Sequence, residues 1–292
     1  MTPAISPSSA NRTRIDAASG AGISPCWTCS TCDQECPVNR STSRLRPQKI
    51  VRMATLGLMD EMLSLPDIWY CLTCRRCTNV CPNQVKPESL IGHLRREAVR
   101  RGLVSIETYR RYQRFFLRFQ RIRLQLATDL LRSDTTTFES NNWQRWLTEP
   151  PPANGDREVV FIGRSATSGN WRADIDPFQI AACFSCSECS NACPISGDRK
   201  VFDPQWIFRM ANLGQMEPLL TSAAIWLCIK CGRCSDACGQ LVQGRQVIEF
   251  LQQKAVTEGH VPADFPFRWS HAQSWIYSEF VREIDSLLSS AH

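Results

Sequence analysis

The chain has 292 residues, and a composition that is 43% hydrophobic and 21% charged excludes an intrinsically disordered protein. The length favours two domains. The net charge of +6 is unevenly divided, with +9 in residues 1–157 and −3 in the remainder, and sixteen cysteines stand out.

Residues 1–14 contain no apolar run and no cleavage pattern, so we expect no secretory signal. The longest apolar run, residues 225–229, is far shorter than the roughly 20 residues that cross a bilayer. We therefore expect a cytoplasmic protein. In that reducing setting, clustered cysteines indicate metal rather than disulfides.

The cysteines form four runs with the spacing C-x2-C-x2-C-x3-C. This is the spacing of bacterial two-cluster ferredoxins, in which the fourth cysteine ligates the other cluster. Zinc is a weaker alternative because its sites typically combine two cysteine pairs separated by a longer loop. The predicted ligands of four [4Fe–4S] clusters are Cys26, Cys29, Cys32, Cys36, Cys71, Cys74, Cys77, Cys81, Cys183, Cys186, Cys189, Cys193, Cys228, Cys231, Cys234 and Cys238.

The ferredoxin pattern predicts crossed ligand sets, each with three cysteines of one run and the last cysteine of the other. The sets of the first half are Cys26, Cys29, Cys32 with Cys81, and Cys71, Cys74, Cys77 with Cys36. Those of the second half are Cys183, Cys186, Cys189 with Cys238, and Cys228, Cys231, Cys234 with Cys193. Four filled clusters leave no open iron position, which favours electron transfer over catalysis.

Helices are predicted between and after the runs. Pro47 suits a first helical turn and the mostly apolar residues 48–63 follow it. A second helix opens at Pro87 and closes at Gly102 in the C′ position. Related helices are predicted near 205–217 and 245–258, and strand signals are nearly absent.

Residues 107–132 predict a long amphipathic helix. Its apolar face consists of Tyr112, Phe115, Phe116, Phe119, Ile122 and Leu126. Its polar side consists of Arg110, Arg111, Arg114, Arg118, Arg121 and Arg123. Such a face can pack against a partner or within the chain, remain solvated, or lie on an anionic membrane. Membrane contact is less favoured, and nucleic acid is not expected because no binding motif accompanies the charge.

A boundary is predicted at residues 149–157, where three prolines and an Asn-Gly turn form a linker. The domains are then residues 1–148, which include the basic helix, and 158–292, with one short candidate strand at 158–162. The second half repeats the first at an offset of 157 residues, which aligns every cysteine and also Pro47 with Pro204 and Gly57 with Gly214. We predict an all-α fold made by tandem duplication.

The stretches 47–63, 66–69 and 71–82 resemble the iron–sulfur C subunit of heterodisulfide reductase, and residues 225–238 resemble a second, diverged copy. The resemblance covers 26–103 and 183–260 and implies an α-helical ferredoxin fold that relays electrons to the catalytic B subunit, which has CCG-type cysteine motifs. A flavin-containing subunit is a second candidate partner. This chain has no Cys-Cys pair, so we expect no disulfide-reducing site of its own. In its duplicated form, the chain resembles the C-type subunits of the heterodisulfide-reductase-like complexes of sulfur-oxidising microbes.

Three further residues are singled out. Trp69 and Trp226 each lie two residues before a predicted ligand and can cover a cluster, although an ordinary core position is equally compatible with the sequence. Gly239 follows Cys238 where the other runs have proline. We predict a different potential or stability for the cluster that Cys238 serves.

The leading functional hypothesis is an electron-transfer iron–sulfur subunit that relays electrons between a redox donor and a catalytic partner. Two alternatives stay open: a structural or redox-sensing iron–sulfur protein, and an enzyme in its own right. Reversible redox cycling of all clusters favours the first hypothesis, and turnover by the isolated chain favours the last.

Overall fold

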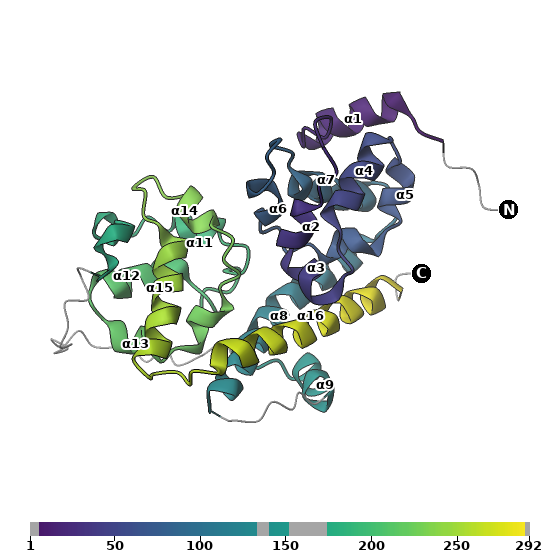
Figure 1. The fold of residues 1–292 in the computed structure, drawn as a ribbon. Coiled ribbons are helices and arrows are strands. Elements are labelled where there is room, and N and C mark those ends of the chain that lie inside the picture. The colour runs from purple at the N-terminus through teal and green to yellow at the C-terminus, as the bar shows by residue number, and fades with distance from the viewer. Residues whose placement is uncertain (1–5, 133–139, 152–173, 290–292) are drawn as a thin grey trace. The chain divides into compact units, whose positions relative to one another are not determined.

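The computed structural model describes residues 6–132, 140–151 and 174–289. Contacts divide the chain into two compact units: residues 1–115 with 274–292, and residues 116–273. The divisions fall inside helices α8 (Ile106–Arg132) and α16 (Phe265–Ser289) (Figure 1). The predicted linker at 149–157 is described only as far as Pro151, so it stays a prediction, and the candidate strand at 158–162 lies outside the described residues.

The first unit is organised around α7 (Pro87–Arg100), which packs against α1, α4, α5 and η1 (Figure 1). Its apolar face buries Leu90, Ile91 and Leu94 almost completely. The elements that precede it are α1 (Ser9–Ser19), α2 (Thr31–Glu35), α3 (Pro37–Thr42), α4 (Pro47–Thr55), α5 (Met59–Leu63), the 3-10 helix η1 (Pro66–Tyr70) and α6 (Arg76–Asn79).

The predicted helix over 48–63 is wrong in one respect, because the structure has two helices, α4 and α5, with a break at residues 56–58. Gly57 has φ +73°, and a Cβ there would lie 2.1 Å from the backbone oxygen of Ser8. The chain turns at Gly57 because glycine adopts this backbone angle without steric cost and has no Cβ to block this close approach. The second unit has the same break at Gly214, with φ +78°.

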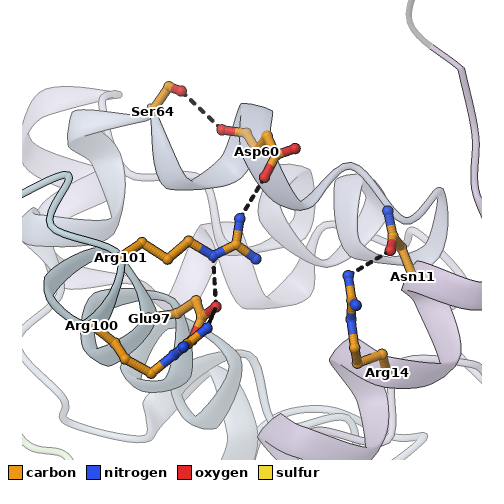
Figure 2. A network of polar contacts seen from close by, with 7 residues as sticks. All are labelled: Asn11, Arg14, Asp60, Ser64, Glu97, Arg100 and Arg101. Carbon is orange, nitrogen blue, oxygen red and sulfur yellow. Dashed lines mark hydrogen bonds and ion pairs between the residues drawn. The ribbon is translucent and has the colours of Figure 1, made fainter.

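The C-terminal end of α7 is joined to α5 by an ion-pair network (Figure 2). The Glu97 carboxylate accepts bonds from Arg100 Nε and Arg101 Nε, each at 2.6 Å, and Arg101 Nη1 donates to Asp60 at 2.7 Å. The bonds from Arg100, followed by those from Arg101, lower the pKa of Glu97 to about 2. Gly102, with φ +72°, follows the helix end, which confirms its predicted position.

The second unit repeats this arrangement around α15 (Gly244–Thr257), which packs against α12, α13, α14 and η4 (Figure 1). Before α15 it contains α9 (Ser140–Thr148), η2 (Asp176–Phe178), η3 (Ile180–Ala182), α11 (Glu188–Ala192), α12 (Pro204–Asn212), α13 (Met216–Leu220), η4 (Ala223–Leu227) and α14 (Arg233–Asp236). No strand occurs in the described ranges, which confirms the predicted all-α fold.

The long basic helix is confirmed as α8, and Phe119 and Ile122 on its predicted apolar face are fully buried. The prediction is wrong for Arg123, which is 0% exposed. Its Nη2 donates to the Leu227 carbonyl at 2.9 Å and its Nη1 to Gln120 at 2.9 Å. A single-helix pattern cannot anticipate this, because the acceptor comes from η4, more than a hundred residues later. None of the described helices has the length and apolar character needed to cross a membrane.

Candidate iron–sulfur sites

The predicted crossed sets differ in burial in the first unit. The inner set, Cys36, Cys71, Cys74 and Cys77, is entirely buried. The outer set, Cys26, Cys29, Cys32 and Cys81, is half-buried apart from the exposed Cys29. Cys36 therefore shares the environment of the second run, and Cys81 shares that of the first.

A cavity in the first unit has an empty volume of about 320 Å³ and is lined by all four cysteines of the inner set. Val38, Leu45 and Ile91 supply an apolar wall. Residue 36 reaches this cavity because α3 begins at Pro37, directly after it, and leads the chain away from the first run. Four thiols around one cavity are a donor set that fits a [4Fe–4S] cluster.

A cavity in the second unit is lined by the outer set of that unit, Cys183, Cys186, Cys189 and Cys238, and has an empty volume of about 390 Å³. Cys234 and Phe208 also line it. The last cysteine of the second run thus lies with three cysteines of the first run. The inner set of this unit, Cys193, Cys228, Cys231 and Cys234, is half-buried except for the buried Cys234.

All sixteen cysteines lie within the described residues, and none is in a disulfide. In the same described ranges, no three His, Cys, Asp or Glu side chains converge closely enough to hold a single metal ion.

Each cysteine run has the same backbone conformation around its second cysteine. The residue before and the residue after that cysteine both have positive φ, between 53° and 80°. These residues are Thr28, Ser30, Thr73, Arg75, Ser185, Ser187, Lys230 and Gly232. Successive N–H groups in such a loop turn toward one centre and form an anion-binding concavity of the kind found at many Fe–S sites. Sequence reasoning missed this feature, because only Gly232 among the eight is a glycine.

Two of these N–H groups donate to cysteine sulfur. Thr73 N lies 3.3 Å from Cys71 Sγ, and Lys230 N lies 3.4 Å from Cys228 Sγ. The two bonds occur at equivalent positions, one within each unit. Backbone donors to cluster sulfurs stabilise negative charge there and so raise the reduction potential.

Burial dominates the electrostatics of the inner sets. It raises the pKa of Cys36 to about 12 and that of Cys228 to about 11. It raises the pKa of Cys77 well above its ordinary value, and the neighbouring Cys71 adds to the effect. Cluster binding must therefore displace protons from these thiols.

Trp69 and Trp226 lie in the core of their units, 2% and 5% exposed. Trp69 packs edge-on against Tyr112 of α8 at 5.4 Å, and Trp226 packs edge-on against Phe265 of α16 at 4.8 Å. Neither tryptophan lines the two cysteine cavities. Their predicted role in covering a cluster stays a prediction.

The sequence profile of the 4Fe-4S dicluster domain family matches residues 22–85 and again 179–242. The two matches confirm the predicted duplication of a two-cluster domain. Together with sixteen cysteines, they fit four [4Fe–4S] clusters.

Curated relatives extend the likeness beyond the cysteines. The chain is 38% identical over 92 residues, 32% of its length and 49% of the relative, to the C subunit of the H(2):CoB-CoM heterodisulfide,ferredoxin reductase of Methanothermobacter marburgensis. It is 39% identical over 97 residues, 33% of its length and 50% of the relative, to the second iron–sulfur C subunit of the CoB–CoM heterodisulfide reductase of Methanocaldococcus jannaschii. A protein of Archaeoglobus profundus, named for its likeness to the heterodisulfide reductase C subunit, is 35% identical over 88 residues, 29% of this chain and 47% of that protein.

The chain thus spans about half the length of the curated relatives it matches. The predicted resemblance to the C subunit of heterodisulfide reductase is confirmed at this level, and the likeness supports a role in electron transfer.

Proposed function

We propose that this chain is an electron-transfer subunit that relays electrons through four [4Fe–4S] clusters between a redox donor and the catalytic partner of a heterodisulfide-reductase-like complex. The clusters supply one-electron oxidation and reduction when bound. The proposal rests mainly on one observation: cysteines from two separate runs line one cavity in each unit, four in the first unit and five in the second. Each domain of the duplication, residues 1–148 and 158–292, is assigned one pair of ligand sets, and residues 149–157 link them.

The outer sets are the proposed points of electron entry and exit. Each contains one exposed cysteine, Cys29 in the first unit and Cys186 in the second. The residue after the first cysteine of the same run is an exposed aromatic, with Trp27 72% and Phe184 66% exposed. Large aromatic side chains are enriched at protein interfaces. A redox partner that docks on them would come close to an exposed ligand.

The inner sets are the proposed internal positions of the relay. In the first unit all four thiols are buried, and the cavity is lined by the apolar Val38, Leu45 and Ile91 and by the ion pair of Arg75 and Glu88, which limits the access of water to the ligands. Trp69 and Trp226 are proposed to contribute to this exclusion from the core side. A dry site strengthens the effect of each nearby charge and hydrogen-bond donor on the potential.

The likeness to the heterodisulfide reductase C subunit suggests the partner. We infer a protein that resembles the catalytic B subunit and has CCG-type cysteine motifs, because this chain has no Cys-Cys pair from which to build such a motif. A flavin-containing subunit is the second candidate, at the other end of the relay. We also infer a cytoplasmic location, since the thiols must remain reduced until clusters are inserted.

The test is an anaerobic preparation of the full chain, with iron and sulfide analysis and a redox titration followed by EPR. About sixteen iron and sixteen sulfide per chain, all reversibly reducible, are expected. Clusters that degrade on the first oxidation would contradict a relay and favour a structural or sensing role. Anaerobic affinity purification followed by mass spectrometry tests the partner. Recovery of a CCG-motif protein is expected, and its consistent absence would contradict the assignment.

A further inference from the structure

Arg95 is a charged residue buried beside the inner set of the first unit. It lies on α7 and is 8% exposed. Its Nε donates to the carbonyl of Ile68 and its Nη2 to the carbonyl of Cys71, each at 2.6 Å. Its Cζ lies 5.2 Å from the ring centre of Tyr112 and 5.9 Å from that of Trp69. The guanidinium is therefore enclosed by carbonyl oxygens and aromatic rings.

The charge of Arg95 has no carboxylate partner among the residues that the structure describes. Burying a charge is unfavourable unless an opposite charge compensates it. The Glu88 carboxylate at the same cavity is paired with Arg75. The inner set is the negative charge that adjoins Arg95, because Cys71 is both a predicted ligand and an acceptor of the Arg95 bond. A buried positive charge that donates to the carbonyl of a ligand residue is placed to act as a counter-charge to that ligand set.

The second unit has a neutral residue at the equivalent position. Gln252, at the repeat offset of 157 from Arg95, is 6% exposed. Its Nε2 donates to the carbonyl of Ile225 at 2.8 Å, which repeats the Arg95 bond to Ile68. A neutral amide is thus sufficient for the shared hydrogen bond. What the first unit adds is the positive charge.

We propose that Arg95 sets the reduction potential of the cluster bound by Cys36, Cys71, Cys74 and Cys77, by holding a permanent positive charge beside it. This inference rests on the proposed function. A fixed buried cation stabilises the reduced, more negative state and raises the potential.

The second unit carries other cations near its inner set. Arg123 donates to the Leu227 carbonyl, and Lys230 lies between two cysteines of the inner set. The order of the wild-type potentials therefore depends on several charges. The shift on substitution isolates the contribution of Arg95.

The experiment is an EPR-monitored redox titration of the full holoprotein with Arg95→Gln, Arg95→Lys and Gln252→Arg. We expect Arg95→Gln to lower one midpoint potential by at least about 59 mV, which corresponds to a tenfold change in a one-electron reduction equilibrium. The other potentials should not change. Arg95→Lys should keep that potential near the wild-type value. Gln252→Arg should raise a different potential, and it tests the same charge effect if Arg95→Gln fails to retain its cluster.

The matched control is Arg96→Gln, which removes the same charge from the adjacent, exposed position of α7 and should leave every potential unchanged. Equal shifts in Arg95→Gln and Arg95→Lys would overturn the proposal, since they would indicate a packing role. The proposal would also be overturned if neither Arg95→Gln nor Gln252→Arg shifts a midpoint potential. These outcomes presuppose clusters that cycle reversibly, so they are distinct from a failure of the relay itself.

Discussion

At the scale of single residues, Gly57 permits the contact between the α4–α5 break and the start of α1. Ser8 N donates to the carbonyl of Leu56 at 2.9 Å. The Ser8 backbone oxygen occupies the space that a Cβ at Gly57 would need. A side chain at residue 57 must therefore both adopt a left-handed backbone angle and displace α1.

We predict that Gly57→Ala lowers the free energy of unfolding by about 2–4 kcal/mol, from a left-handed conformation costing about 1–2 kcal/mol and an overpacking cost of similar size. The control is Gly20→Ala, at φ +60° with no atom within 4 Å of the added Cβ. Gly20→Ala should lower the free energy of unfolding only by the cost of the left-handed conformation. Denaturant unfolding of the anaerobic holoproteins measures both, and equal losses would contradict the close approach.

Gly239 differs from the equivalent Pro82 in residue type but not in the course of the chain around it. Leu241 N donates to the Cys238 carbonyl at 3.1 Å, as Gln84 N does to the Cys81 carbonyl at 3.1 Å. Leu241 and Gln84 also share a φ of 58°. The backbone at residue 239 thus follows the path that proline adopts in the first unit.

Gly239→Pro should therefore stabilise the second unit by about 0.4–1 kcal/mol, because proline restricts the unfolded chain at a compatible site. The reciprocal variant Pro82→Gly should destabilise the first unit by a similar amount. Thermal unfolding under anaerobic conditions measures both. In air, clusters should be lost more slowly from Gly239→Pro and faster from Pro82→Gly. A lower unfolding temperature for Gly239→Pro would show that residue 239 requires glycine.

At the scale of elements, α4 and α12 are equivalent helices whose first turns are capped by carboxylates from different places. In the first unit Asp33 of α2 accepts from Gln48 N at 2.7 Å and from Arg46 Nε at 3.1 Å. In the second unit the N-cap Asp203 accepts from Gln205 N at 3.1 Å and from the hydroxyl of Ser190. Position 33 corresponds to 190 and position 46 to 203. The capping carboxylate therefore stands at position 33 in the first unit and at the equivalent of position 46 in the second, while the cap itself is retained.

This exchange predicts strong coupling between positions 33 and 46. Asp33→Ser alone should cost about 1 kcal/mol, the usual cost of a lost helix cap. Arg46→Asp alone should cost at least as much, because it places two carboxylates together. The double variant recreates the arrangement of the second unit and should recover most of the loss. Unfolding of the four proteins gives the coupling energy, and additive losses would contradict the prediction.

The ends of α7 and α15 show a related exchange. Glu97 and Arg101, four residues apart, form an ion pair at the C-terminal end of α7. The equivalent residues on α15 are Lys254 and Glu258, paired at 2.7 Å with the charges reversed. The spacing of the pair is retained, while the acidic and the basic residue exchange places.

At the scale of the whole molecule, the two outer sets offer docking points in halves of opposite charge. Trp27 belongs to the half with a net charge of +9 and Phe184 to the half with −3. Complementary charge steers association and discriminates between partners. We therefore expect donor and acceptor to use different loops.

Trp27→Ala and Phe184→Ala should each weaken binding of one redox partner by about tenfold, the equivalent of 1.4 kcal/mol, because an interface aromatic often contributes that much. Binding is measured separately for donor and acceptor with the anaerobic holoprotein, and EPR should show unchanged potentials. Phe267→Ala removes an aromatic that is 80% exposed on α16, outside the cysteine runs, and serves as the control. Unchanged binding of both partners in both variants would rule out docking at these loops.

Much of the fold followed from local signals. Pro87 and Gly102 bracket α7 as predicted, because a first-turn proline and a left-handed glycine act within one helical turn. The prediction of a single helix over 48–63 was wrong, because the chain turns at Gly57. There the backbone approaches Ser8, which lies far away in the sequence. A mostly apolar pattern continues through such a break and does not reveal it.

The sequence alone determined the sixteen cysteines, their four runs, the repeat of 157 residues and the helices between the runs, because these depend on spacing and on local backbone preference. Only the tertiary structure decided that Arg123 is buried, and that Arg95 and Gln252 are buried and donate to the equivalent carbonyls of Ile68 and Ile225. Those outcomes depend on which distant segments pack around each site, and packing sets the burial and charge around the thiols.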